Sequence, residues 1–357
     1  MEAKKQKIFV GISGGVDSSV AAYLLKKEGH DVHGVFVKTW SPEWVPCTWI
    51  EEKRDAMRVC AALDIPFHYL DAEEEYKRGV ADYMIAEYRA GRTPNPDVLC
   101  NRIIKFGVLW DYARSHGADA IATGHYARIK HADTLEHTSV LMRGFDVAKD
   151  QSYFLWMLAQ QELGHIRFPI GHLQKSDVRT IAANAGLFTS EKKDSQGICF
   201  LGDVDMRAFL EHYIEQKRGD VLDETGDVIG EHDGVWFYTL GERHGFRITK
   251  KNPNQSPLYI VAKDIKKNTI TVSETPQVKK DTLEVTITLR DCNWLVTPNN
   301  EKKYTAQIRY HGEHIPIMIK SDRTVVLSYR GVVPLGQSLV VYDGDALVGG
   351  GVIDNIS

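Results

Sequence analysis

A run of glycines, serines and one aspartate is well suited to hold an anion. Residues 11–19 read G-I-S-G-G-V-D-S-S and lie between an apolar, strand-like segment and a helical one. Glycines let backbone N–H groups close around an anion, and the N-terminus of the following helix adds partial positive charge. The run therefore predicts a phosphate-binding loop.

This loop differs from the Walker and dinucleotide-binding loops. Val16-Asp17 stands where a Walker loop needs Gly-Lys, and the glycines do not follow G-x-G-x-x-G. Asp17 beside phosphates would be explained by a Mg²⁺ ion that bridges them. An ordinary structural role stays open, in which Gly14-Gly15 is a tight turn and Asp17 or Ser18 caps the helix.

Two cysteines lie in segments that suit a reactive thiol. Cys100 follows Pro94 and Pro96, and proline restricts its own backbone and that of its neighbour, so we expect a stiff loop here and not a helix start. Cys199 lies in the apolar run Gly-Ile-Cys-Phe. A nucleophilic thiol needs thiolate character, whereas a buried core thiol does not. Both interpretations stay open for each cysteine.

Asp97 lies three residues before Cys100. Its carboxylate could act as a general acid or base, or form an Asx turn after the preceding proline. Of the other cysteines, Cys60 and Cys292 are predicted to be structural and Cys47 is ambiguous. No pair of cysteines has metal-ligand spacing.

The elements that must position these residues alternate between strand and helix in the first half. Strands separated by helices predict a doubly wound parallel α/β sheet, and ligands of such sheets bind at the carboxyl ends of the strands. The predicted strands are 7–12, 32–38, 66–70 and 118–123, and the predicted helices are 17–28, 51–63 and 73–89.

The last third is rich in β-branched residues and turn signals, which predicts an antiparallel barrel or sandwich. We expect a catalytic domain over residues 1–203, a small central linker domain over 204–277 and a C-terminal β-barrel over 278–357. The predicted strands are 258–262, 269–273, 283–289, 304–310, 316–320, 324–329 and 338–342.

Composition excludes several protein classes. The 357 residues are 43 % hydrophobic and 26 % charged with a formal net charge of −4, as in soluble globular proteins and unlike general polyanion binders. No run of about 18 apolar residues is present, so no membrane helix is expected. Five cysteines without a disulfide framework favour a reducing, cytoplasmic location.

The S-G-G-V-D-S run resembles the pyrophosphate loop of the N-type ATP pyrophosphatases. The resemblance implies cleavage of ATP between its α- and β-phosphates, which adenylates an oxygen so that a nucleophile can replace it. Further segments resemble, in the same order, the tRNA 2-thiouridylases of the MnmA type. They read RTPNPDVLCN from Arg92, ATGHYA from Ala122, KDQSYFL from Lys149, DSQGICF from Asp194 and GERHG from Gly241.

That second resemblance implies a reaction, in which sulfur replaces the C2 oxygen of the wobble uridine of tRNA with ATP and a cysteine persulfide. It implies that Cys199 carries the persulfide and that Cys100 is the other catalytic thiol, able to pair with it in a transient disulfide. Asp97 is implied as the acid or base. The implied ATP-binding residues are Gly11, Ile12, Ser13, Gly14, Gly15, Val16, Asp17, Ser18, Val37 and Gly124, and the implied tRNA-binding residues are Asn95, Pro96, Asp97, Lys149, Asp150, Gln151, Arg309 and Tyr310.

The resemblance also implies partners. These are tRNAs for Lys, Glu and Gln, and a sulfur-relay protein or cysteine desulfurase that donates the persulfide. One departure from the family is Glu242, where members often carry glutamine, so no RNA contact is assigned to Gly241-Glu242-Arg243.

Two other classes of function stay open. An ATP-dependent ligase or amidating enzyme of a small molecule would explain the phosphate loop but not the P-N-P-D-V-L-C run, and a non-catalytic RNA-binding module would explain only the barrel. ATP–pyrophosphate exchange would separate the binding module from the two enzymes, and dependence on tRNA would separate the enzymes from each other.

Overall fold

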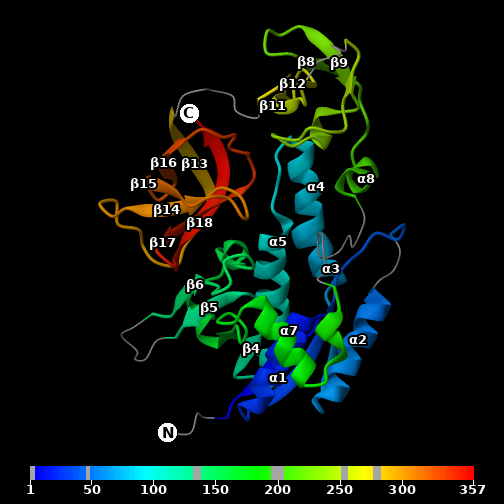
Figure 1. Ribbon diagram of the computed structural model, residues 1–357, viewed down its shortest axis with the longest axis vertical. Coiled ribbons are helices and arrows are strands. Elements are labelled where there is room, and N and C mark those ends of the chain that lie inside the picture. Colours follow the sequence, from blue (N-terminus) through cyan, green and yellow to red (C-terminus); the bar gives the residue numbers. More distant parts are fainter. Residues whose placement is uncertain (1–4, 46–48, 132–137, 194–204, 251–255, 276–282) are drawn as a thin grey trace.

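Three β-sheets organise the part of the chain that the computed structural model describes, residues 5–45, 49–131, 138–193, 205–250, 256–275 and 283–357 (Figure 1). Cys47 and Cys199 lie outside these described residues. Within them, no helix is long and apolar enough to cross a lipid bilayer.

The first sheet is parallel and has the order β3-β2-β1-β4-β7. Helices α1, α2 and α7 pack on one face of it through Val20, Val59 and Val178. The other face packs against α6 and the barrel. The predicted doubly wound sheet is thus confirmed. Its strands are β1 (Lys7–Gly11), β2 (Asp31–Lys38), β3 (Phe67–Asp71), β4 (Ala120–Ala122) and β7 (Ile166–Arg167), and the helices are α1 (Val16–Lys27), α2 (Trp49–Ala62) and α7 (Lys175–Asn184).

Two long helices stand beside this sheet, and each contains a π-helical segment. The first runs through α3 (Glu73–Tyr76), Lys77–Ala81 and α4 (Asp82–Arg89), and the second through α5 (Pro96–Leu99), Cys100–Val108 and α6 (Leu109–Ser115). They meet closely where Ile103 lies over Gly79: a Cβ on Gly79 would fall 2.7 Å from the Ile103 side chain. π-Helical turns are frequent at functional sites.

The second helix corrects the expectation of a stiff loop at Cys100. Pro96 is the first residue of α5, with Asn95 as its N-cap. Proline fits this position because the first N–H of a helix has no partner within the helix, and its fixed φ is already helical. The prolines therefore mark a helix start, which places Cys100 one turn into a helix.

The second sheet has the order β10-β9-β8-β12-β11 and contains one parallel pair, β12 with β8. Two strands that we expected in the barrel or sandwich, 258–262 and 269–273, belong to this sheet instead. Its elements are β8 (Gly219–Leu222), β9 (Val228–His232), β10 (Arg247–Ile248), β11 (Tyr259–Asp264) and β12 (Thr269–Ser273), preceded by α8 (Met206–Glu211).

The third sheet is an antiparallel barrel, as predicted, closed by the pairing of β13 with β18. The hairpin β5–β6 from the first half of the chain joins it at β18, where Ala346 pairs with Met142. The prediction missed β18, because its Gly349-Gly350-Gly351 resembles a loop. The strands are β5 (Ala127–Lys130), β6 (Val140–Arg143), β13 (Leu283–Trp294), β14 (Tyr304–Gln307), β15 (Ile315–Ser321), β16 (Thr324–Tyr329), β17 (Ser338–Asp343) and β18 (Ala346–Ile356), and short 3₁₀ turns lie at Ser152–Leu155, Gln160–His165, Phe188–Glu191 and Val235–Phe237.

A histidine pair in the parallel sheet predicts that the protein loses stability in acid. His33 Nδ1 lies 2.9 Å from His68 Nε2 across β2 and β3. Burial is the largest cause that lowers the pKa of both rings, and the charge of His33 lowers the pKa of His68 further.

The unfolded chain therefore binds more protons than the folded chain below pH 6.5. The contribution of the two histidines to the free energy of unfolding is fully present above that pH. It falls as the pH drops toward the lowered folded-state pKa values, by at most about 1.4 kcal/mol per pH unit for each histidine. Urea unfolding of the wild type and of His68→Asn at pH 7.5 and 5.5 should show a smaller acid loss in the variant. An equal loss in both proteins would contradict this assignment.

Candidate active site

The phosphate loop leaves a helix N-terminus without a side-chain cap. Gly15 is the N-cap of α1, so neither Asp17 nor Ser18 is the cap, and a glycine has no side chain that could accept from the first N–H groups of the helix. The Ser18 hydroxyl donates to the Gly15 carbonyl at 3.2 Å and accepts from the Ser13 N–H at 3.2 Å, which folds the loop on itself. An uncapped helix start beside two hydroxyls is an arrangement that fits a polyphosphate.

Gly14 has a φ of 75°, a conformation that favours glycine. A Cβ there would fall 2.8 Å from Cβ of Asp55 on α2. Lys192 joins the same contact, because its Nζ donates to the Gly14 carbonyl at 3.1 Å and to Asp55 Oδ2 at 2.7 Å. The loop is thus held from outside as well as from within.

Asp17 is bound by Lys175, a residue that the sequence did not indicate. Lys175 Nζ lies 2.8 Å from both carboxylate oxygens of Asp17, and the Tyr126 hydroxyl donates to Oδ1 at 2.8 Å. Within the described ranges no three His, Cys, Asp or Glu side chains gather as a metal site. Asp17 is thus paired with Lys175 and Tyr126, and a Mg²⁺ ion bound by its carboxylate would have to displace Lys175.

Lys175 itself is held at the first residue of α7. Its backbone N–H donates to Asp146 Oδ2 at 2.9 Å, so a buried carboxylate fixes the start of the helix that carries it. The ammonium group is thereby placed at the phosphate loop. An anion arriving at the loop would meet this cation as well as the α1 N-terminus.

Gly124 lies against the phosphate loop, where a Cβ would fall 2.6 Å from the backbone nitrogen of Ser18. Its lack of a side chain thus allows the loop after β4 to approach the loop after β1. Val37, at the carboxyl end of β2, packs against the same hydrophobic cluster as Cys100. Val37, the predicted adenine contact, and Cys100, one of the two predicted reactive thiols, therefore lie at the same hydrophobic cluster.

Cys100 is buried, with 2 % of its surface exposed. Burial raises the pKa of two other thiols, those of Cys60 and Cys292, to about 11. These two are therefore poor nucleophiles, as their structural interpretation requires.

The predicted tRNA-binding residues of the barrel come together with those of the catalytic half. The Tyr310 ring lies 4.3 Å from that of Phe154 and 6.1 Å from that of Tyr153, centroid to centroid. Burial first, and then the charges of Asp150 and Asp97, raise the pKa of Tyr310 to about 12. Tyr310 therefore keeps its proton and lies within the influence of both carboxylates.

Tyr153 connects the same groups. Its hydroxyl donates to the Ser338 carbonyl of the barrel at 2.8 Å, and burial raises its pKa while the Asn95 side chain and the Arg309 charge oppose the rise. Residues 92–97, called the base segment below, thus face the barrel across Tyr153. Arg309 is exposed and its guanidinium donates to the Val332 carbonyl at 3.0 Å.

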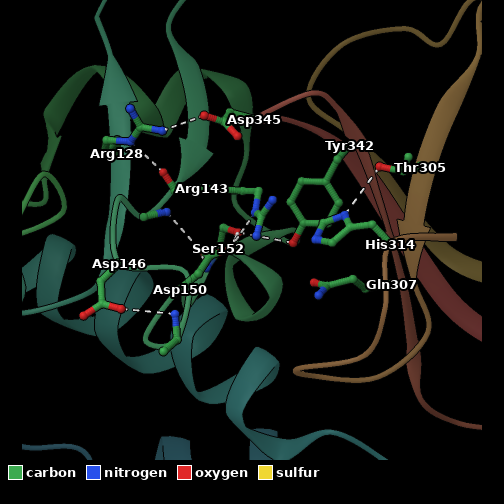
Figure 2. Close-up of polar contacts among 12 residues, drawn as sticks. Arg128, Arg143, Asp146, Asp150, Ser152, Thr305, Gln307, His314, Tyr342 and Asp345 are labelled. Carbon is green, nitrogen blue, oxygen red and sulfur yellow. Dashed lines mark hydrogen bonds and ion pairs between the residues drawn. The ribbon is translucent and has the colours of Figure 1, made fainter. Parts of the chain in front are cut away.

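Asp150 organises the adjoining loop and does not project toward solvent. It is 7 % exposed, and its carboxylate accepts from the N–H groups of Gly144 and Ser152 and from Arg143 at about 3 Å (Figure 2). Ser152 in turn lies 3.2 Å from the Tyr342 hydroxyl of the barrel.

The neighbours of Asp150 in the chain are both half-buried. The Gln151 side chain accepts from the Tyr126 N–H at 3.0 Å. In the segment 149–151, Lys149 and Gln151 are half-buried and Asp150 is buried. The side chains of Asp150 and Gln151 thus bind neighbouring parts of the fold and shape the site from within.

Three family models together match most of the chain. Residues 6–203 match a family model described as the tRNA methyl transferase HUP domain, 207–274 match the tRNA methyl transferase PRC-barrel domain, and 284–353 match the aminomethyltransferase beta-barrel domain.

Full-length relatives carry one name. The chain is 43 % identical to the tRNA-specific 2-thiouridylase MnmA of Geobacillus thermodenitrificans, over 98 % of this chain and 95 % of that protein. It is 44 % identical to the protein of the same name from Stenotrophomonas maltophilia, over 97 % of this chain and 93 % of that protein. Among solved structures, an NMN synthetase from Francisella tularensis is 17 % identical with a TM-score of 0.33, over 54 % of this chain and 67 % of that one.

Proposed function

This chain belongs to the family of tRNA-specific 2-thiouridylases of the MnmA type, and from that membership we propose that it replaces the C2 oxygen of the wobble uridine of tRNA by sulfur. The observation that supports this function best is the position of barrel residue Tyr310, which packs against Phe154 and Tyr153 and lies within the influence of the Asp97 charge, one turn before Cys100. A basic group and an aromatic ring suit phosphate and an unstacked base.

ATP supplies the activation, by turning the C2 oxygen into a phosphate leaving group. The backbone N–H groups at the start of α1 and the Ser13 and Ser18 hydroxyls are proposed to bind its phosphates. Lys175 adds a positive charge at the same loop. Val37 is proposed to contact the adenine, and Gly124 to give the close packing that shapes the loop.

Sulfur transfer is proposed to use two thiols. The terminal sulfur of a persulfide on Cys199, which lies outside the described residues, attacks C2, and AMP leaves with the former C2 oxygen. Attack of the Cys100 thiolate on Cys199 Sγ breaks the S–S bond, leaves sulfur on C2 and forms a disulfide. A two-electron thiol reductant then restores both thiols. Release of sulfide from the persulfide before attack is the alternative order.

Asp97 is proposed as the acid or base near the uridine, because it is half-buried, lies one turn before Cys100 on the same helix and acts on Tyr310. Asn95 and Pro96 would contact the base beside it. Residues 1–203, 204–277 and 278–357 are proposed as the catalytic, linker and tRNA-contacting units. The proposed partners are tRNAs for Lys, Glu and Gln and a persulfide-donating protein.

The test is a thiolation assay with purified protein, an unmodified tRNA transcript, ATP and a persulfide source. Mass spectrometry of the digested tRNA should show 2-thiouridine at the wobble position, with AMP released in proportion. Absence of 2-thiouridine, or AMP release that does not depend on tRNA, would contradict the proposed function. A tRNA with cytidine at the wobble position is the matched control substrate.

A further inference from the structure

A carboxylate buried between two arginines joins the two halves of the proposed site. Glu87 lies on α4 and is 5 % exposed. Its oxygens accept from Arg92 Nε at 2.7 Å, from Arg92 Nη2 at 2.5 Å and from Arg290 Nη2 at 2.6 Å. Burial raises the pKa of Glu87, but Arg92 and Arg290 outweigh burial and leave the pKa below its usual value. The carboxylate is therefore charged.

The two arginines come from different parts of the fold. Arg92 opens the base segment, directly after the turn at Gly91, whereas Arg290 lies on barrel strand β13. Arg290 is itself held by Asp291 at 2.7 Å and by Asp354 at 3.5 Å, so its guanidinium has a fixed place on the barrel. Figure 1 shows α4 and the barrel side by side.

Further contacts extend the same connection. The Thr93 N–H donates to the Leu335 carbonyl of the barrel at 2.9 Å. The Gln337 side chain donates to the carbonyls of Thr93 and Pro94 at 2.9 and 3.2 Å. The base segment is thus bound to the barrel along its backbone, and Glu87 is its charged anchor.

These ion pairs restrict the orientation of the three side chains. A bidentate arginine–carboxylate pair allows little rotation, and a second arginine on the same carboxylate restricts it further. A buried carboxylate that loses a partner carries an uncompensated cost, so the three side chains favour one arrangement. That arrangement sets the distance between the barrel and the start of α5.

We propose that Glu87 is a positioning residue that fixes the base segment, and with it Asp97 and Cys100, against the tRNA-contacting face of the barrel. This inference rests on the proposed function. Glu87 touches neither substrate nor reacting atoms. It acts through Arg92, so that a tRNA seated on Arg309 and Tyr310 presents its uridine to a base segment already in place.

The test compares Glu87→Gln with Asp345→Asn. Asp345 pairs with Arg128 at 3.0 Å and also joins the barrel to the first half of the chain, but it does not contact the base segment. Hydrogen–deuterium exchange of peptides covering residues 92–100 should rise in Glu87→Gln and stay at the wild-type level in Asp345→Asn. The single-turnover thiolation rate at saturating tRNA should fall by about 10- to 100-fold in Glu87→Gln alone, with the Kd for ATP unchanged.

Arg290→Met provides a second variant in case Glu87→Gln shows no cooperative unfolding transition. It breaks the link to the barrel but leaves the Glu87–Arg92 pair intact. Unchanged exchange in residues 92–100 of both variants, or faster exchange with a wild-type thiolation rate, would overturn the inference. A wild-type protein that makes no 2-thiouridine would refute the proposed function. In that case, faster exchange of residues 92–100 in Glu87→Gln would still support the positioning contact.

Discussion

Cys100→Ser should lower the rate of 2-thiouridine formation by at least about 1,000-fold, while ATP still binds. Serine nearly matches the size of cysteine but is not ionised near neutral pH. It therefore cannot replace the thiolate that attacks the S–S bond of the persulfide. The residue is buried one turn into the helix that begins at Pro96, so the substitution changes little of the surface. The measurements are mass spectrometry of digested tRNA and nucleotide binding by calorimetry.

Cys292→Ser is the matched control. Cys292 is a half-buried thiol on β13 whose pKa is raised to about 11 by burial, and nothing in the proposed reaction uses it. The Cys292→Ser variant should form 2-thiouridine at the wild-type rate. If Cys100→Ser also formed 2-thiouridine at that rate, a catalytic role for Cys100 would be excluded. Cys199→Ser should likewise abolish thiolation and retain ATP binding.

Lys175→Met should reduce ATP-dependent thiolation by about 100-fold. The ammonium lies at the phosphate loop, where it forms an ion pair with Asp17. Negative charge that develops on the phosphates during adenylation would be stabilised by this cation, which methionine cannot replace although it is similar in length. Pyrophosphate release measured with tRNA present is the direct readout.

Lys302→Met serves as the control for loss of one positive charge, because Lys302 pairs with Asp343 on the barrel surface. It should leave pyrophosphate release unchanged. Lys175→Arg should recover part of the rate, since the charge is kept. A wild-type rate of pyrophosphate release in Lys175→Met would show that Lys175 serves only to hold Asp17.

Asp17 allows a discriminating comparison with the same assay. If its role is to hold Lys175 at the loop, Asp17→Asn should slow turnover more than it weakens nucleotide binding. If instead it is a Mg²⁺ ligand, the variant should shift the Mg²⁺ concentration needed for half-maximal rate.

The sequence alone determined the local features of this protein. The glycine-rich turn before α1, the alternating strands and helices and the β-rich last third were all predictable, because backbone conformation and the spacing of apolar residues are set by neighbouring residues. The segments that carry Cys100 and Cys199 were also recognisable from their residue order. Even locally one signal was misinterpreted, since Asn95-Pro96 is a helix start.

Only the tertiary structure decided which distant side chains meet. Lys175 and Asp17 are separated by 158 positions, and Arg290 and Glu87 by 203. No periodicity reports such pairs, because a charged residue on a surface and one that closes a buried ion pair have the same sequence signal. The chain must first pack α7 onto α1 and the barrel onto α4, and that packing selects which charges are removed from water together.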